Sequence, residues 1–287
     1  MTRTPTLLLA VLACLFVSLP SFAHQDELVE AKLPSGKVAS AAFHGGNKGL
    51  PAVLILHGFL QTRTFPTIVS TMEALSEADY TVVVPTLSLG ISGRNKSLPC
   101  EAVHLHTLDQ DRAEIAFWVR WLTRKGHSHI ILVGHSFGNV QLLASLGRAP
   151  LPGVKQLLMI SLVDVEAKQS AQQRAQLVQD LRDRVARGDR SLVEVEFGHC
   201  KKYVSPPAAL LSYLEISRSG ILESLVKSPV PTSVIMGGKD DRMGSEWVEK
   251  LSSRGISVQT IPGASHFFDS QYEFDLQDAV LKALPGR

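Results

Sequence analysis

Five residues, Gly134-His135-Ser136-Phe137-Gly138, place a serine between two glycines where an apolar run ends and a helical pattern begins. A tight strand-to-helix turn strains the backbone at its central residue, and flanking glycines lack the side chains that would clash there. The serine oxygen is then held at the edge of a sheet and at a helix N-terminus, which favours developing negative charge. The pattern therefore indicates a nucleophilic serine at position 136.

Strands and helices that could position this serine alternate along the chain. Strands are expected at 52–56, 81–85, 130–133, 157–163, 230–236 and 256–261. The first of these is a continuous apolar run, which suits a strand buried on both faces of a parallel sheet. Helical patterns lie between or after them at about 64–78, 107–126, 140–146 and 272–284. Residues 28–43 alternate around a Pro-Ser-Gly turn, which predicts a hairpin. The order predicts the α/β class, with a mostly parallel central sheet covered by helices on both faces.

One segment interrupts this alternation. Between Asp164 and about Leu222 there is no strand-like apolar run, and residues 169–187 show a polar helical pattern with a narrow apolar stripe. We expect a small, mostly helical cap at about 165–222, lying on the carboxyl edge of the sheet. The alternative is a pair of surface helices without a role in function.

From about Ala52 to its C-terminus, the chain resembles the α/β-hydrolase family. That family orders its motifs as a strand followed by His-Gly, a nucleophile elbow, an acid after a later strand and a histidine after the last strand. The matching segments are 56–59 (Leu-His-Gly-Phe, with His57 and Gly58), 134–138, 236–241 (Met-Gly-Gly-Lys-Asp-Asp) and 262–268 (Pro-Gly-Ala-Ser-His-Phe-Phe). The resemblance implies the α/β-hydrolase fold.

The same resemblance implies acyl transfer by a catalytic triad. Ser136 would attack a carbonyl carbon, and His266 would take the serine proton and return it to the leaving group. Asp240 would orient the imidazole and stabilise its cation. The backbone N–H groups of Phe59 and Phe137 would hold the oxyanion.

Two other carboxylates are alternatives to Asp240 as the acid. Asp241 is its neighbour in the same loop, and Asp164 follows the strand after the elbow, where some members of the family carry the acid. Asp240 is favoured because it lies three residues after Gly237, as the family pattern prefers. His266 follows the last strand in a G-x-x-H-F context that no other histidine of the chain shares.

The expected substrate is a small-molecule carboxylic ester. A thioesterase or a lipase would share the triad, and a non-catalytic binding protein that kept the fold is the competing class. No cofactor and no metal are expected, because the chain has no phosphate-binding or dinucleotide motif. His104 and His106 lie close to Asp109 and Asp111, but the H-x-H spacing is short and these carboxylates complement the start of a helix.

Composition and the N-terminus point to an exported globular protein. The formal net charge is +2 over 287 residues without a basic block, which argues against a nucleic-acid partner. Residues 1–23 have a weakly positive start, an apolar run and small residues before a cut after Ala23. This pattern predicts a secretory signal peptide, with 24–287 exported to the periplasm or secreted as one hydrolase domain. An uncleaved anchor is the alternative, and no other segment is apolar enough to span a membrane.

Cys100 and Cys200 are the cysteines that remain after removal of the expected signal peptide. Two cysteines in an exported chain suggest a disulfide, and two separate buried thiols are the alternative. If the cysteines are joined, the bond would tie the cap to the core and limit how far the cap can open.

Overall fold

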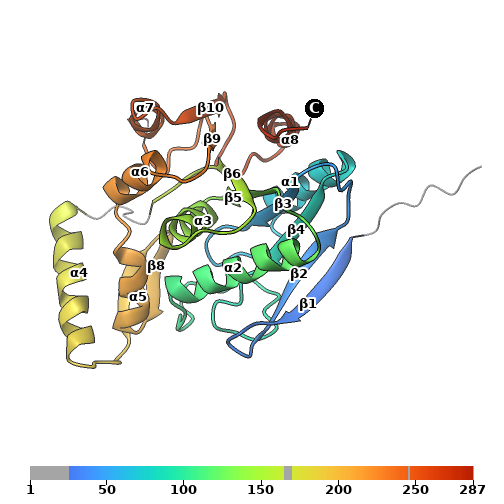
Figure 1. The fold of residues 1–287 in the computed structure, drawn as a ribbon. Coiled ribbons are helices and arrows are strands. Elements are labelled where there is room, and N and C mark those ends of the chain that lie inside the picture. The colour runs from blue at the N-terminus through green and yellow to red at the C-terminus, as the bar shows by residue number, and fades with distance from the viewer. Residues whose placement is uncertain (1–25, 165–169, 245, 287) are drawn as a thin grey trace, which may run out of the picture.

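A computed structural model describes residues 26–164, 170–244 and 246–286, so the expected signal peptide lies outside the described residues. An eight-stranded sheet forms its centre (Figure 1). Across the sheet the strands are β1 (Glu27–Lys32), β2 (Val38–His44), β4 (Thr81–Thr86), β3 (Ala52–Leu56), β5 (Ile130–His135), β6 (Val154–Ile160), β9 (Thr232–Gly237) and β10 (Ser257–Ile261). The β1–β2 and β2–β4 pairs are antiparallel and the others are parallel, so the predicted hairpin and the mostly parallel sheet are both confirmed.

Helices cover both faces of the sheet because its central strands are apolar on both sides. All residues of β3, β4 and β5 are buried. Within β3, Leu54 and Leu56 belong to one core cluster, whereas Val53 and Ile55 belong to the other. The first cluster packs against α2 (Leu108–Arg124) and α3 (Phe137–Arg148), and the second packs against α1 (Pro66–Glu77) and α8 (Tyr272–Ala283). Figure 1 shows these two pairs of helices on opposite sides of the sheet.

The predicted start of α2 is confirmed by its capping. The Thr107 side chain accepts a hydrogen bond from the Gln110 backbone N–H, and the Gln110 side chain accepts one from the Thr107 backbone. This reciprocal pair satisfies donors that a helix N-terminus otherwise leaves free. It fixes the point at which the preceding loop, which carries Cys100 and the two histidines of the H-x-H pattern, enters the helix.

The segment inserted between β6 and β9 contains a hairpin as well as helices. Its described elements are α4 (Ala171–Ala186), β7 (Val193–Phe197), β8 (Cys200–Ser205), α5 (Pro207–Leu214) and α6 (Arg218–Val226). The expectation of a mostly helical insertion missed the hairpin. Val193, Val195 and Phe197 alternate with glutamates. A strand with one solvent-exposed face shows this alternation and has no continuous apolar run.

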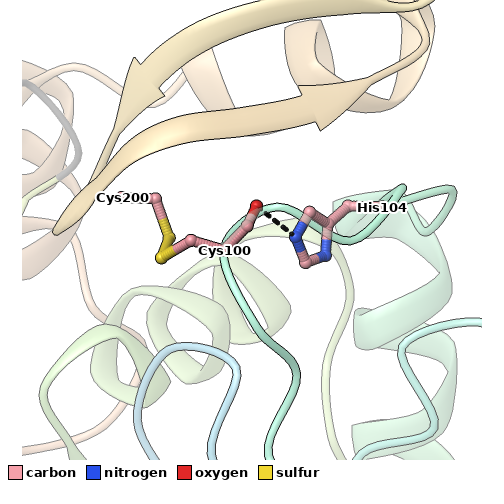
Figure 2. Close-up of a disulfide and its surroundings, with 3 residues drawn as sticks. All are labelled: Cys100, His104 and Cys200. Carbon is pink, nitrogen blue, oxygen red and sulfur yellow. Dashed lines mark hydrogen bonds between the residues drawn. A yellow bond between two sulfur atoms is a disulfide. The ribbon is translucent and has the colours of Figure 1, made fainter.

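Cys100 and Cys200 form a disulfide, which confirms the bonded alternative (Figure 2). It joins the loop before α2 to the first residue of β8, across a sequence separation of 100. The inserted segment is therefore linked covalently to the core. Among the described helices, none is long and apolar enough to cross a bilayer.

Candidate active site

Ser136 lies in a strained turn between β5 and α3. Its φ of 55° and ψ of −126° are a conformation that non-glycine residues rarely adopt, at a cost of about 1–3 kcal/mol. A Cβ at Gly138 would lie 2.5 Å from the His57 carbonyl oxygen, and one at Gly134 would lie 2.4 Å from Asn139 Oδ1. Glycine is thus required at both flanking positions, as the motif predicts. The backbone of His57 lies directly against Gly138, and Asn139 of α3 lies directly against Gly134.

Three side chains from distant parts of the chain form a continuous hydrogen-bonded row. Ser136 Oγ lies 2.9 Å from His266 Nε2, and His266 Nδ1 lies 2.7 Å from Asp240 Oδ2. Water has little access to the row, since the side chains of His266 and Asp240 are 5% and 0% exposed. In an activated nucleophile, the hydroxyl is hydrogen-bonded to one nitrogen of an imidazole, and the other nitrogen of that ring is hydrogen-bonded to a carboxylate.

The loops that follow β9 and β10 bring Asp240 and His266 together. The Lys239 N–H donates to the Ala264 carbonyl at 2.8 Å, so the two loops run side by side. The His266 carbonyl accepts from Ser161 Oγ at 2.9 Å and from His135 Nε2 at 3.1 Å. Burial lowers the pKa of His135 to about 3, so this ring is a neutral donor. His135 therefore supports the backbone of His266 and is not part of the row.

The two alternative acids lie elsewhere. Asp164 forms an ion pair with Arg218 of α6, and Asp241 is exposed on the outside of its loop. Burial by itself would raise the pKa of Asp240, but the hydrogen bond and charge of His266, with Arg242 nearby, hold that pKa below its usual value. Asp240 is therefore ionised at neutral pH and can orient the imidazole.

The loop after β3, which carries the Phe59 N–H, passes beside Ser136. A Cβ at Gly58 would lie 3.2 Å from Ser136 Cβ, so this loop passes directly against the nucleophile. Within the described residues, the N–H groups of Phe59 and Phe137 donate to no protein acceptor. Both expected oxyanion donors are thus on segments that touch Ser136 and are not used by the fold.

Asn139 and Arg94 support this site through contacts that the motifs do not predict. Asn139 Nδ2 donates to the Ile160 carbonyl at 2.8 Å, and the Ser136 N–H donates to the same carbonyl at 2.9 Å, so the elbow is anchored on the end of β6. Arg94, which is buried in the loop after β4, donates to the backbone around Leu60. Both side chains form hydrogen bonds with backbone atoms that are far away in the sequence, and motif spacing does not predict such contacts.

The β7–β8 hairpin covers the ring of Phe59. That ring lies 5.4 Å, centroid to centroid, from the rings of Phe197 and His199, and 5.8 Å from that of Tyr203. Tyr203 in turn stacks on His104 at 4.2 Å, and the His104 N–H donates to the Val204 carbonyl. Figure 2 shows the hairpin passing above the disulfide and the loop of His104. The inserted segment is thus held against the side chain of Phe59, the residue whose N–H is an expected oxyanion donor.

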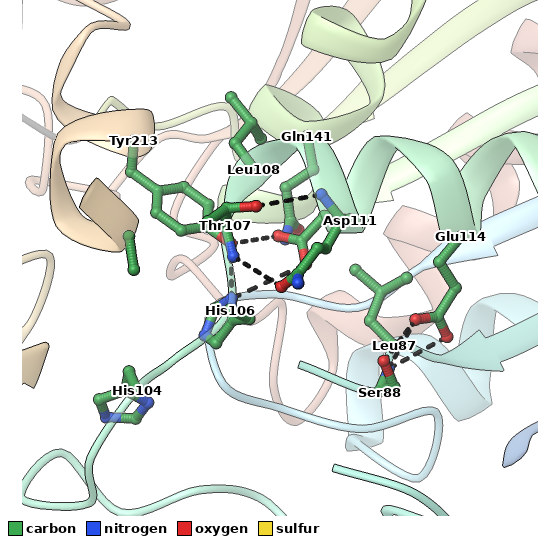
Figure 3. A network of polar contacts seen from close by, with 12 residues as sticks. Leu87, Ser88, His104, His106, Thr107, Leu108, Asp111, Glu114, Gln141 and Tyr213 are labelled. Atoms are coloured by element: carbon green, nitrogen blue, oxygen red, sulfur yellow. Dashed lines mark hydrogen bonds and ion pairs between the residues drawn. The ribbon is translucent and has the colours of Figure 1, made fainter. Parts of the chain in front are cut away.

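The H-x-H segment joins a buried polar network in place of a metal site (Figure 3). His106 Nδ1 donates to the Tyr213 hydroxyl at 2.6 Å, the Tyr213 hydroxyl donates to Asp111, and Gln141 Nε2 donates to Asp111 at 2.6 Å. Burial raises the pKa of Asp111 to about 7 and lowers that of His106 to about 3. Asp109 lies on the surface against Arg112. These contacts connect α2, α3 and α5, which ties the inserted segment to the core.

The described residues bring three metal-type ligands together at Cys100, His199 and Cys200, within 4.8 Å of one another. The disulfide uses both sulfur atoms, so no thiolate is available there. This group therefore does not provide a metal centre.

Comparisons with known proteins identify the family and the fold. The model of a family described as the alpha/beta hydrolase family matches residues 53–274. Among solved structures, Est1E from Butyrivibrio proteoclasticus is 17% identical, covers 90% of this chain and 96% of its own, and has a TM-score of 0.60. A thioesterase domain from the curacin biosynthetic pathway is 19% identical, with coverages of 90% and 99% and a TM-score of 0.59. The alpha/beta hydrolase GrgF from Penicillium sp. sh18 is 14% identical, with coverages of 90% and 96% and a TM-score of 0.65. The search of curated proteins finds no match. Identities this low show a shared fold only.

Proposed function

Because this chain belongs to the alpha/beta hydrolase family, we propose that it is a serine hydrolase that cleaves a carboxylic ester of a small molecule. One observation supports this most: the hydrogen bonds that run from Asp240 through His266 to Ser136, in the chain order typical of this fold. A structural serine would need neither the imidazole nor the buried carboxylate behind it. The proposal assigns the three side chains the roles of nucleophile, base and orienting acid.

The chemistry follows from the positions of these atoms. Ser136 Oγ attacks the ester carbonyl carbon while His266 Nε2 takes the hydroxyl proton, and Asp240 stabilises the imidazolium that forms. The tetrahedral intermediate collapses, the C–O bond to the alcohol breaks, and the alcohol leaves with the proton from His266. Water then attacks the acyl-enzyme by the same route, which releases the carboxylic acid and restores the serine.

The oxyanion of each intermediate accepts hydrogen bonds from the Phe59 and Phe137 N–H groups. Each such donor contributes about 3–4 kcal/mol to lowering the barrier in comparable sites. The N-terminus of α3, where Phe137 is the first residue, adds a positive dipole end directed toward the same region.

We further propose that residues 1–23 are a secretory signal peptide, and that the segment at about 165–222 acts as a cap over the site. The Cys100–Cys200 disulfide supports export, because such bonds persist in oxidising compartments. The packing of Phe197, His199 and Tyr203 on Phe59 supports the cap. This arrangement would limit which acyl or alcohol groups reach Ser136.

The proposal is tested with the purified exported chain on p-nitrophenyl esters of increasing acyl length, with matched thioesters and amides. We expect ester hydrolysis that Ser136→Ala reduces by about 10⁶-fold in kcat, because members of a triad act as a unit. Ser145→Ala, which removes another buried serine of α3, is the matched control and should retain activity. Turnover of thioesters alone would make the protein a thioesterase. A folded protein that turns over none of these substrates would support the non-catalytic alternative.

A further inference from the structure

Arg94 is a buried cation beside the loop that carries the proposed oxyanion donor Phe59. It is 4% exposed. Its side chain donates to backbone carbonyls that precede and follow it in its own loop, and to carbonyls of the loop after β3. The acceptors are the carbonyls of Leu87 (2.6 Å from Nε), Lys96 (3.0 Å from Nη1), Leu60 (3.4 Å from Nη1) and Gln61 (2.8 Å from Nη2). The guanidinium thus fixes the end of the Phe59 loop.

His57 extends this support to the other side of Phe59. Its Nε2 lies 3.1 Å from the Leu87 N–H and 3.3 Å from Arg94 Nη2, so this nitrogen is the acceptor. Its Nδ1 therefore carries the proton and donates to the Gly58 carbonyl at 2.9 Å. Burial first, and then the charge of Arg94, lower the pKa of His57 to about 3, so the ring stays neutral and keeps this tautomer.

The Gly58 carbonyl and the Phe59 N–H belong to one planar peptide group. A hydrogen bond that fixes the direction of the carbonyl therefore fixes the direction of the N–H as well. Donation from His57 also polarises that peptide, which makes its N–H a stronger donor. Arg94, His57 and this peptide form a continuous chain that ends at the proposed oxyanion site.

No carboxylate of the described residues lies within ion-pair distance of the Arg94 guanidinium. Glu114 is near enough to attract it but accepts hydrogen bonds from the backbone and hydroxyl of Ser88. Burial lowers the pKa of Arg94 to about 10, so the side chain remains charged at neutral pH. A buried cation without a contacting acid favours negative charge that develops nearby.

We propose that Arg94 is a positioning residue for the oxyanion hole, and that it acts through His57 on the peptide that carries the Phe59 N–H. The inference rests on the proposed hydrolase function and adds a residue to it. A purely structural arginine would affect stability alone. A positioning arginine also affects the stabilisation of the tetrahedral intermediate, because loss of its contacts lets the Gly58–Phe59 peptide rotate.

The test compares Arg94→Met and Arg94→Lys with Arg174→Met. Methionine removes the charge and all donors, whereas lysine keeps a charge but cannot span the same carbonyls as the planar guanidinium. Arg174 is a matched control, because it is also buried and donates to backbone carbonyls, those of Leu214 and Ile216, in the inserted segment. Each variant is first checked for folding by circular dichroism and thermal unfolding.

The readouts are kcat and KM for an ester that the wild-type protein hydrolyses, and the Ki of a trifluoromethyl ketone. This inhibitor forms a hemiketal on the serine whose oxyanion occupies the hole, so it reports on the oxyanion donors directly. For Arg94→Met we expect kcat to fall by about 100-fold with KM within about twofold, and the Ki to rise in proportion. Arg94→Lys should fall between this variant and the wild type, and Arg174→Met should keep kcat and Ki.

Two results would overturn the inference and are distinguishable from failure of the proposed function. A folded Arg94 variant that keeps kcat and Ki would show that Arg94 has only a structural role. An unchanged Ki with a lower kcat would place its effect outside the oxyanion hole. If Arg94→Met does not fold, Arg94→Lys decides by the same two readouts. A wild-type protein that neither hydrolyses esters nor binds the ketone would instead refute the proposed function, and the inference with it.

Discussion

Loss of the Cys100–Cys200 disulfide should lower the free energy of unfolding by about 4–5 kcal/mol and leave the triad assembled. The bond closes a loop with a sequence separation of 100, and cross-linking a loop of that length removes about 4.7 kcal/mol of entropy from the unfolded chain in the chain-entropy model. For a protein of this size, that difference corresponds to a decrease in Tm of roughly 10–20 °C.

The triad should persist because other contacts hold the hairpin in place. The His104 N–H donates to the Val204 carbonyl at 2.8 Å, Ser205 Oγ donates to the His104 carbonyl at 2.7 Å, and Tyr203 stacks on His104. None of these contacts involves a sulfur atom. Ester hydrolysis well below the new Tm should therefore be retained in the folded fraction.

The assay is urea unfolding of the wild type and of the double variant Cys100→Ser/Cys200→Ser, each with and without a reductant. We expect the reductant to shift the wild-type midpoint to that of the double variant and to leave the double variant unchanged. Hydrolysis is measured on the same samples. Equal midpoints for all four samples would refute the reasoning, because the disulfide would then constrain neither the unfolded nor the folded chain.

Three further predictions test the roles of single residues. Asp240→Asn should lower kcat by about 10⁴-fold, whereas the neighbouring Asp241→Asn should keep it within about threefold, as measured by ester hydrolysis. Gly138→Ala should destabilise the fold by about 1–3 kcal/mol in thermal unfolding, because its Cβ would lie 2.5 Å from the His57 carbonyl oxygen, and an unchanged Tm would contradict this. Asp111 has a folded-state pKa of about 7, above the usual value of about 3.9, so its contribution to stability is complete below about pH 4 and is lost as the pH rises to about 7. The unfolding free energy of the wild type minus that of Asp111→Asn should therefore fall by up to about 4 kcal/mol across this range in urea titrations, and a flat difference would show that Asp111 is ionised throughout.

The sequence predicted those parts of the fold that depend on local patterns. The segments that form β3, β4 and β5 each contain a run of three to five consecutive apolar residues, which suits a strand covered on both faces. The capping box at Thr107 and the glycines around Ser136 are equally local. The chain order of serine, acid and histidine then placed the candidate triad, because loops at the carboxyl ends of neighbouring parallel strands meet at one edge of the sheet.

Contacts between residues far apart in sequence could not be predicted from such local patterns. The choice between a disulfide and two separate thiols depends on proximity, and Cys200 lies in the β7–β8 hairpin, whose packing on the loop of Cys100 is not visible in the sequence. The network of Asp111 and Tyr213 joins side chains 102 positions apart, and Arg94 donates to a loop about thirty residues earlier. The hairpin itself was missed because apolar and polar residues alternate along it, so its composition resembles that of a polar loop.

Reaction of the purified protein with a fluorophosphonate, followed by peptide mass mapping, tests the central claim most directly. Such a probe phosphonylates a serine only where a base and an oxyanion hole activate it. We expect one modified residue, Ser136, and no modification in Ser136→Ala or His266→Ala. A folded wild-type protein that remains unmodified under both oxidising and reducing conditions, or that is modified at another serine, would contradict it.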